Sequence, residues 1–203
     1  MKRLLLLFGI SLVALSATFS QGYQVGDKAS DFKLKNVDGK YFSLKDYPKA
    51  KGFVVIFTCN HCPYAQAYQD RIIEIDKTYK SKGYPVIAIS SNDPALVAQD
   101  SYDEMVKRAK EKAYTFPYLF DDNQEVCLKY GATRTPQVFL LEKAGNDLIL
   151  RYTGAIDDNY QDASKVNTSY LSNAVNALLT GGTPNPAFTK AIGCAIKGKA
   201  SKT

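Results

Sequence analysis

The sequence predicts an α/β domain with a central mixed β-sheet flanked by helices. Two β-rich apolar runs, at residues 53–57 and 84–90, are separated by a stretch in which apolar residues recur at helical spacing. That order is typical of a parallel β-α-β unit. Segments 137–142 and 148–152 flank Ala144-Gly145-Asn146, which predicts an antiparallel hairpin. A sheet with both kinds of pairing is mixed, and the connecting helices must cover its faces.

The first 20 residues have the layout of a secretory signal peptide. Lys2 and Arg3 precede an apolar run over residues 4–17, and small or polar residues follow it. The run is too short for a comfortable membrane span, and no later stretch of about 20 apolar residues follows. We expect cleavage after Ser20, with a cut after Ala17 as the alternative. The product would be secreted or periplasmic, with no stable membrane insertion after cleavage.

The mature chain, residues 21–203, has the length of a single domain. The full sequence has a mild net charge of +6, and its lysines are scattered and interleaved with acids, as over residues 107–112. This pattern indicates solvated helix faces and not a stripe that binds nucleic acid. We therefore expect one domain with a C-terminal tail at about 183–203 and no nucleic-acid partner.

An N-terminal β-hairpin should come first. Residues 32–37 and 41–44 flank Asp38-Gly39, a pair that favours the tight turn of a hairpin. The run at 53–57 then predicts a fully buried central strand, and the helix after it is expected over residues 63–79. A strand, a turn that contains two cysteines and a helix therefore follow one another directly.

The later segments predict the remaining elements. A polar helix is expected over residues 101–113, and residues 115–120 predict a short strand. Asp122 and Glu125 resemble a capping box at the start of another short helix. The closing helix is expected over residues 168–179, and no pattern indicates the path of the tail beyond it.

The motif Cys59-Asn60-His61-Cys62 lies where the buried strand meets the helix. The first turn of a helix has unpaired N–H groups and a partial positive charge, which stabilise a thiolate and lower the pKa of the thiol. We therefore expect Cys59 to be the nucleophile. Cys62 is close enough in the sequence to attack a mixed disulfide at Cys59, which releases the bound partner.

His61 is the only histidine in the chain. When protonated, it would add positive charge beside the Cys59 thiolate, lower the pKa of Cys59 further and make the cysteine pair more oxidising. The alternative is a solvent-exposed histidine with little effect on the chemistry.

The order of strand, Cys-x-x-Cys, helix and a later Thr135-Pro136 resembles the thioredoxin superfamily. The stretch at 59–64 and the run at 89–93 are similar to its redoxin branch, the alkyl hydroperoxide reductase/thiol-specific antioxidant family. This resemblance spans nearly the whole mature chain and implies a thioredoxin-like fold with a cis Thr135-Pro136 bond. It assigns Cys59 as nucleophile, Cys62 as resolving thiol, and Thr135 and Pro136 to substrate binding.

Two features depart from the family patterns. Thioredoxins often have a buried acid in the strand before the motif, and residues 53–57 contain none, so proton transfer needs His61, water or another residue. Peroxidatic members have a Pro-x-x-x-Thr-x-x-Cys arrangement, whereas Ile56 stands three residues before Cys59. The resemblance therefore favours disulfide exchange over a redoxin-type thiol peroxidase, which is the alternative function.

Cys127 and Cys194 complete the four cysteines, and export would place them where disulfides persist. A second disulfide between them would pin the tail. The alternatives are a buried free thiol at Cys127 and a Cys194 that reaches the motif as an additional exchange partner.

The sequence therefore predicts an exported thiol–disulfide oxidoreductase without a cofactor. Its partners would be protein or small-molecule disulfides or dithiols and an unidentified redox partner, and the direction of electron flow stays open. Cys59, His61, Cys62 and Cys194 are also suitable ligands for copper(I) or zinc, which makes metal handling a further alternative. A lone Cys-x-x-Cys without a second ligand pair does not indicate a structural zinc site, so no bound metal is expected. A noncatalytic binding module with structural cysteines is the remaining alternative.

Overall fold

The computed structural model describes residues 22–198, in which the main sheet has eight strands. In chain order these are β1 (Lys28–Ala29), β2 (Lys33–Asn36), β3 (Tyr41–Ser43), β4 (Gly52–Phe57), β5 (Val86–Ser90), β6 (Tyr118–Phe120), β8 (Gln137–Ala144) and β9 (Asp147–Gly154). A small second sheet consists of β7 (Arg134–Thr135) and β10 (Cys194–Ala195). The helices are α1 (Pro63–Tyr79), α2 (Tyr102–Glu111), α3 (Glu125–Tyr130) and α4 (Tyr170–Leu179), with 3₁₀ turns at Leu44–Asp46, Lys80–Lys82, Ala98–Asp100 and Ala163–Lys165.

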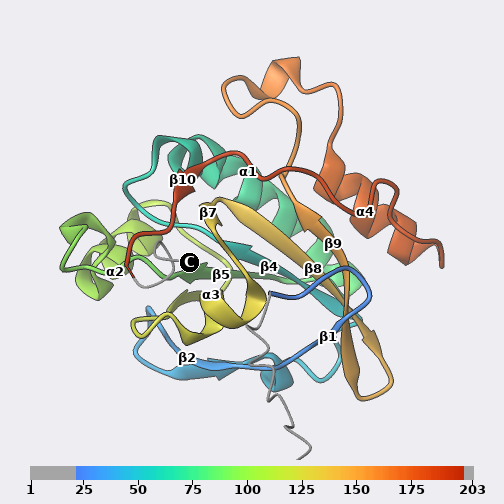
Figure 1. The fold of residues 1–203 in the computed structure, drawn as a ribbon, viewed down its shortest axis with the longest axis horizontal. Coiled ribbons are helices and arrows are strands. Elements are labelled where there is room, and N and C mark those ends of the chain that lie inside the picture. Colours follow the sequence, from blue (N-terminus) through green and yellow to red (C-terminus); the bar gives the residue numbers. More distant parts are fainter. Residues whose placement is uncertain (1–21, 199–203) are drawn as a thin grey trace, which may run out of the picture.

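The strands lie in the order β1-β9-β8-β4-β5-β6-β2-β3, which places β4 in the interior of the sheet (Figure 1). β4 pairs in parallel with β5 and antiparallel with β8. The predicted α/β class and mixed sheet are therefore confirmed. The predicted signal peptide at residues 1–20 lies outside the described residues.

The central strand separates two hydrophobic cores. Successive side chains of a strand point to opposite faces, and Val54 and Ile56 accordingly pack with α1, α2 and α4. Phe53, Val55 and Phe57 pack on the other face with the N-terminal hairpin and α3. All five side chains are at most 1% exposed. Since both faces of β4 are covered, its carboxyl end is held rigidly where the cysteine motif begins.

The local predictions are largely confirmed. β2 and β3 form the predicted hairpin, in which Gly39 has a φ of 83° that glycine adopts without strain. α1 has the predicted bounds, while the helix predicted over 101–113 is shorter at both ends. β8 and β9 form the predicted antiparallel pair.

The start of α3 differs from the predicted capping box at Asp122. The N-cap residue is Gln124, and the neighbouring acid Asp121 accepts hydrogen bonds from the amides of Val126 at 3.2 Å and Cys127 at 2.9 Å. Asp121 is fully buried, so its carboxylate depends on these donors. Two adjacent acids look alike in the sequence, and tertiary burial decides which one caps the helix.

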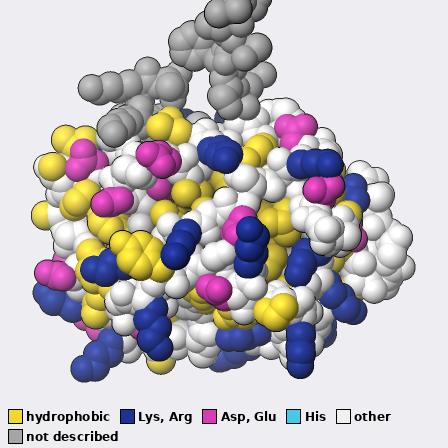
Figure 2. All heavy atoms as spheres, turned by 90° about the horizontal axis from the view of Figure 1, so that it is seen from below, with side chains coloured by type: hydrophobic (Ala, Val, Ile, Leu, Met, Phe, Trp, Pro, Cys, Tyr) yellow, Lys and Arg dark blue, Asp and Glu magenta, His cyan; other side chains and the backbone are white. Residues whose placement is uncertain are grey.

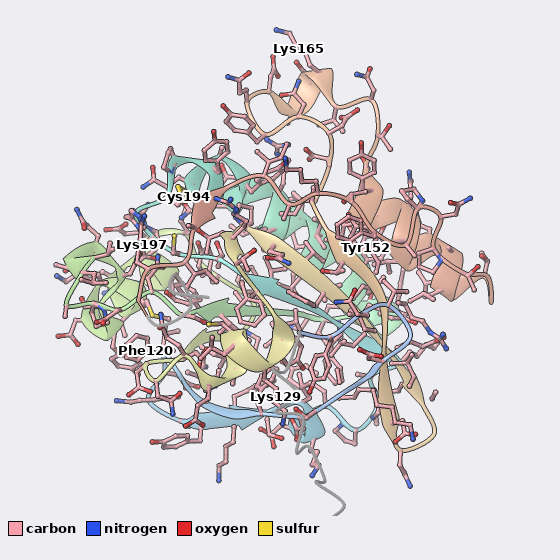
Figure 3. The ribbon with its side chains drawn as sticks, viewed as in Figure 1. Phe120, Lys129, Tyr152, Lys165, Cys194 and Lys197 are labelled. Atoms are coloured by element: carbon pink, nitrogen blue, oxygen red, sulfur yellow. A yellow bond between two sulfur atoms is a disulfide. The ribbon has the colours of Figure 1, made fainter. Side chains whose placement is uncertain are left out.

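The tail forms a strand that was not predicted. β10 pairs antiparallel with β7, so that Cys194 lies opposite Thr135 and Ala195 opposite Arg134. This pairing brings β10 close to the start of α1 (Figure 1), and Figure 3 labels Cys194 there.

Basic and acidic side chains are mixed on the face shown in Figure 2. The mixture matches the interleaving of charges in the sequence. Among the residues that the structure describes, no helix is long and apolar enough to cross a membrane.

We predict that Leu140→Ala destabilises the fold by about 2–5 kcal/mol, because Leu140 is fully buried in β8 and its removal leaves a cavity. Urea unfolding followed by circular dichroism measures the change. Leu96→Ala is the matched control: Leu96 is 65% exposed, and its loss should change stability by less than about 0.5 kcal/mol. Equal losses in the two variants would contradict the assignment of the core.

Candidate active site

The cysteine motif connects the carboxyl end of β4 to the first turn of α1. Cys62 is the N-cap residue of α1, and Pro63 occupies the first helical position, where its missing N–H costs nothing. Cys59 is 1% exposed and Cys62 is fully buried. The amides of His61 and Cys62 donate hydrogen bonds to the Cys59 sulfur. The strand-to-helix placement predicted for the motif is therefore present.

Thr135, on strand β7, contacts the sulfur atoms of both motif cysteines. Its hydroxyl lies 3.3 Å from Cys59 Sγ, and its carbonyl oxygen lies 3.3 Å from Cys62 Sγ. The Thr135-Pro136 peptide bond is cis, as predicted. Thr135, which was assigned to substrate binding, thus lies directly against both cysteines assigned to chemistry, although it is more than 70 positions away in the sequence.

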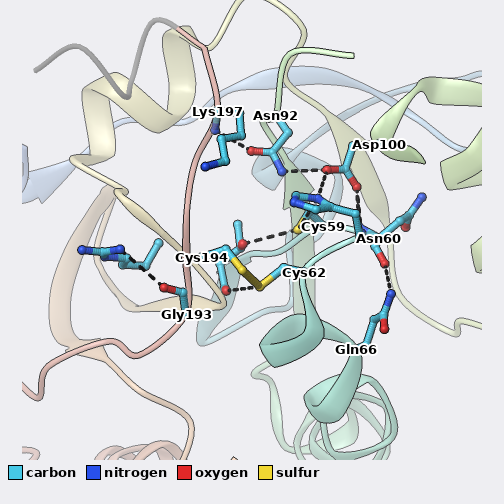
Figure 4. Close-up of a disulfide and its surroundings, with 12 residues drawn as sticks. Cys59, Asn60, Cys62, Gln66, Asn92, Asp100, Gly193, Cys194 and Lys197 are labelled. Carbon is cyan, nitrogen blue, oxygen red and sulfur yellow. Dashed lines mark hydrogen bonds and ion pairs between the residues drawn. A yellow bond between two sulfur atoms is a disulfide. The ribbon is translucent and has the colours of Figure 1, made fainter. Parts of the chain in front are cut away.

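Asp100 holds the motif loop, although no pattern in the sequence pointed to this residue. One carboxylate oxygen accepts the amide N–H groups of Asn60 at 2.7 Å and His61 at 3.1 Å. The other accepts Asn92 Nδ2 at 2.7 Å and lies 2.6 Å from His61 Nδ1 (Figure 4). His61 Nδ1 is also 3.6 Å from Cys59 Sγ. His61 is therefore fixed beside Cys59 and is not a freely exposed side chain.

Asn60 fastens the same loop on its other side. Its side-chain nitrogen donates to the carbonyl of Gln99 at 2.9 Å, and its side-chain oxygen accepts from the hydroxyl of Tyr118 at 3.0 Å. Gln66 donates to the main-chain carbonyl of Asn60 at 2.7 Å. Burial raises the pKa of Tyr118 well above its usual range, so this hydroxyl stays a donor. The backbone and side-chain polar groups of Asn60 consequently all have hydrogen-bond partners.

The pKa of Cys59 is opposite in direction to the sequence-based prediction. Burial of the sulfur and, secondarily, the negative charge of Asp100 raise the pKa of Cys59 to about 11. The hydrogen bond to Thr135 and the amides of Cys62 and His61 oppose this rise without cancelling it. The helix terminus acts as predicted, yet in this conformation desolvation outweighs it. Cys59 is a protonated, shielded thiol here.

The disulfide in the structure joins Cys62 to Cys194, with Cα atoms 6.0 Å apart (Figure 4). The predicted disulfide between Cys127 and Cys194 is therefore wrong, and the alternative in which Cys194 reaches the motif is correct. Cys127 is a fully buried free thiol on α3, and burial raises its pKa to about 12. The pairing of β10 with β7 explains the difference, because it carries Cys194 to Thr135.

Ligand atoms of Cys59, His61 and Asp100 lie within 4.8 Å of one another, a spacing that a metal ion could bridge. The donor set fits a metal poorly. The Asp100 oxygens already accept hydrogen bonds from Asn60, His61 and Asn92, and these bonds hold the loop. Cys62, which the metal alternative also used, is bonded to Cys194.

A shallow cavity of about 240 Å³ opens beside His61. Its walls come from the motif loop and from charged side chains of α2: Glu104, Lys107, Arg108 and Glu111. The mixture of charges gives this cavity polar walls beside the otherwise buried cysteines.

Comparison with known proteins places these observations in a family. Residues 25–160 match the AhpC/TSA family model. The chain belongs to the AhpC/TSA family. This match ends before the segment that contains Cys194, so the third cysteine of the site lies outside the matched region.

The chain is also similar to individual relatives and solved structures. The crystal structure of an uncharacterized conserved protein from Geobacillus kaustophilus is 34% identical, with a TM-score of 0.80, and the match covers 92% of this chain and 98% of that chain. The thiol-disulfide oxidoreductase ResA of Bacillus thuringiensis subsp. konkukian is 27% identical over 157 residues, covering 71% of this chain and 86% of the relative. An exposed lipoprotein thioredoxin from Streptococcus pneumoniae is 24% identical, with a TM-score of 0.54 and coverage of 75% of this chain and 99% of that chain. The last comparison shows the shared thioredoxin-like fold.

We predict that Asp100→Asn lowers the pKa of Cys59 below about 11, because the substitution removes the negative charge that raises it. The alkylation rate of Cys59 should rise with pH without a plateau up to about pH 10 in the unmodified protein and should level off earlier in the variant. Mass spectrometry of the Cys59 peptide measures both profiles.

Gln66→Ala is the matched control for this measurement, since it releases a hydrogen bond of the same loop without changing a charge. Its alkylation profile should follow that of the unmodified protein. An Asp100→Asn profile that also coincides with the unmodified one would show that the charge of Asp100 does not act on Cys59.

Proposed function

We propose that this chain is an exported thiol–disulfide oxidoreductase that exchanges disulfides through a mixed disulfide at Cys59, which Cys62 resolves. The observation that carries the proposal is the convergence of both motif sulfurs on Thr135, on a short strand that already binds an extended segment of chain. The likeness to relatives named thiol-disulfide oxidoreductase ResA supports the same chemistry.

The reaction requires two exchange steps. The Cys59 thiolate attacks one sulfur of a substrate disulfide, a bond forms between Cys59 and the substrate, and the other substrate sulfur leaves as a thiolate. The Cys62 thiolate then attacks Cys59 Sγ, which forms the Cys59–Cys62 disulfide and releases the second substrate thiol. Two electrons pass from the enzyme to the substrate, and an external dithiol must return them. The reverse sequence oxidises a dithiol substrate, and the reduction potentials of the partners set the direction.

Thr135 and Pro136 are proposed to bind the substrate. β10 demonstrates that an extended chain fits against β7 in antiparallel register, with a cysteine opposite Thr135. A protein substrate that replaced β10 would present its own cysteine to the same motif sulfurs. Main-chain pairing of this kind accepts many sequences, so it suits an enzyme with several protein substrates.

His61 is proposed to assist Cys59. Its Nδ1 atom is 3.6 Å from the Cys59 sulfur and is oriented by Asp100. In the protonated form it supplies the positive charge nearest to a developing thiolate, and it offsets the repulsion by Asp100. Once the site is open to water, the desolvation that raises the pKa of Cys59 is relieved, and these groups can favour the reactive form.

We predict that Cys59→Ser lowers the reduction of an aromatic disulfide by on the order of 100-fold or more, because no thiolate remains at the attacking position. Cys62→Ser should form the first mixed disulfide and then stop, and intact-mass analysis should detect this adduct at Cys59. Cys127→Ala is the matched control, since Cys127 is buried on α3 away from the motif cluster, and it should keep normal turnover. Full turnover by Cys59→Ser would refute the proposed function.

Export is tested separately. When the full chain is expressed in a bacterium with a periplasm, we predict that the mature protein begins at Gln21, as determined by N-terminal sequencing of the periplasmic fraction. Leu7→Arg places a charge in the apolar run and should leave the uncleaved precursor in the cytoplasm, whereas Leu7→Ile should be processed normally. Efficient processing of Leu7→Arg would show that residues 1–20 are not acting as a signal peptide.

A further inference from the structure

The segment of residues 193–197, which we call the strap, lies across the active site. Cys194 is bonded to Cys62 and pairs with Thr135 in the two-stranded sheet. The amide of Ile196 donates to the carbonyl of Thr133 at 3.1 Å. The strap therefore occupies the place where the proposed function requires a substrate strand (Figure 4).

The strap is fitted to this place along its whole length. A side chain at Gly193 would overlap the carbonyl of Thr135, so only glycine permits this approach. Ile196 is 1% exposed and packs in the core beneath the sheet. The amide of Lys197 donates to Asn92 Oδ1 at 2.7 Å, and its carbonyl accepts from the amide of Asp93 at 3.0 Å. These contacts indicate that the strap is an integral part of the active site.

The three sulfurs of the site differ in their access to solvent. Cys59 and Cys62 are at most 1% exposed, whereas Cys194 is partly exposed. Thiol–disulfide exchange requires the attacking thiolate to reach the sulfur that it attacks. With the strap closed, an external thiol therefore reaches the disulfide from the side of Cys194.

We propose that Cys194 is a third redox-active cysteine, which takes over the disulfide from the motif and presents it to the redox partner. This inference rests on the proposed function and extends it to the return of electrons. Cys59 and Cys62 serve the substrate, and Cys194 serves a partner that carries a dithiol.

The transfer is an exchange without net oxidation. After a substrate disulfide has been reduced, the Cys194 thiolate attacks Cys62 Sγ of the Cys59–Cys62 disulfide. The Cys62–Cys194 bond forms, the Cys59–Cys62 bond breaks, and Cys59 leaves as a thiolate that takes up the proton lost by Cys194.

The partner dithiol then completes the cycle. Its first thiolate attacks Cys194 Sγ, and Cys62 leaves as a thiolate at the N-terminus of α1, where the helix stabilises it. The second partner thiol attacks the partner sulfur of this mixed disulfide and releases Cys194. Two electrons have passed from the partner to the enzyme, and the partner has become a disulfide.

Asn92 connects the closed strap with the nucleophile. Its Oδ1 accepts from Lys197, and its Nδ2 donates to Asp100, the carboxylate that orients His61 and faces Cys59. In this state burial and Asp100 raise the pKa of Cys59, so Cys59 is a poor nucleophile toward the disulfide beside it. The Cys62–Cys194 bond therefore persists until a partner attacks it.

Disulfide mapping after a single turnover tests the proposal. Trypsin leaves Cys59 and Cys62 in one peptide, residues 52–71, and Cys194 in another, residues 191–197. Reduced full-length protein is mixed with one equivalent of oxidised glutathione, quenched with acid at intervals and alkylated. We expect a bond within peptide 52–71 to form first and the cross-link to peptide 191–197 to replace it.

Reduction of the oxidised protein by dithiothreitol provides the second measurement. Cys194→Ser should be reduced at least about tenfold more slowly than the unmodified protein, because the buried Cys59–Cys62 bond must then be attacked directly. Cys127→Ala removes a cysteine outside the site and should be reduced at the normal rate. If the Cys62–Cys194 bond were merely structural, the cross-link would not appear after the bond within peptide 52–71 and replace it during the mapping time course.

Three outcomes would overturn the inference. The first is that Cys194 is alkylated at every time point. The second is that the cross-link is present before the substrate is added and survives turnover. The third is that Cys194→Ser is reduced at the normal rate. If any of these occurs while Cys59→Ser abolishes exchange, the proposed function stands and only the role of Cys194 fails. If Cys59→Ser retains exchange, the proposed function fails as well.

Discussion

The arrangement of the active-site loop depends on the buried carboxylate of Asp100. A charge without access to water is costly unless hydrogen-bond donors surround it. Asn60 and His61 supply donors from the motif, and Asn92 supplies one from the connection that follows β5. These three segments are held at fixed positions because each must satisfy the same carboxylate. The orientation of His61 toward Cys59 is a direct result.

The parts of the site that were predictable are those with a local cause. The apolar run at 53–57 identifies a buried strand, the periodicity after it identifies a helix, and the cysteine motif lies between them. The cis bond at Pro136 followed from the resemblance to a family and not from its local sequence. Asp100 gave no such signal, because an acid in a polar connection looks like a solvated residue until the fold encloses it.

The tail explains why the predicted disulfide between Cys127 and Cys194 is wrong. A strand of two residues has no periodicity, so its pairing with β7 leaves no pattern in the sequence. That pairing sets the partner of Cys194, and Cys194 packs against the cluster that contains Cys59. The local argument for a lowered pKa of Cys59 considered only the helix and His61, whereas burial and the charge of Asp100 raise the pKa of Cys59. Burial by the fold, which the sequence alone does not reveal, therefore decides the direction in which the pKa of Cys59 is shifted.

The separation of Cys62 and Cys194 by 132 positions has a consequence for the unfolded chain. On the chain-entropy account, a cross-link across a loop of this length restricts the unfolded state by about 5 kcal/mol, whereas one between neighbouring cysteines such as Cys59 and Cys62 restricts it by only about 2 kcal/mol. Replacing the Cys62–Cys194 disulfide by a Cys59–Cys62 disulfide would therefore lower the free energy of unfolding by about 3 kcal/mol. The oxidation state of the protein is the same in both forms. With the strap closed, the protein would therefore be in its form that most resists unfolding.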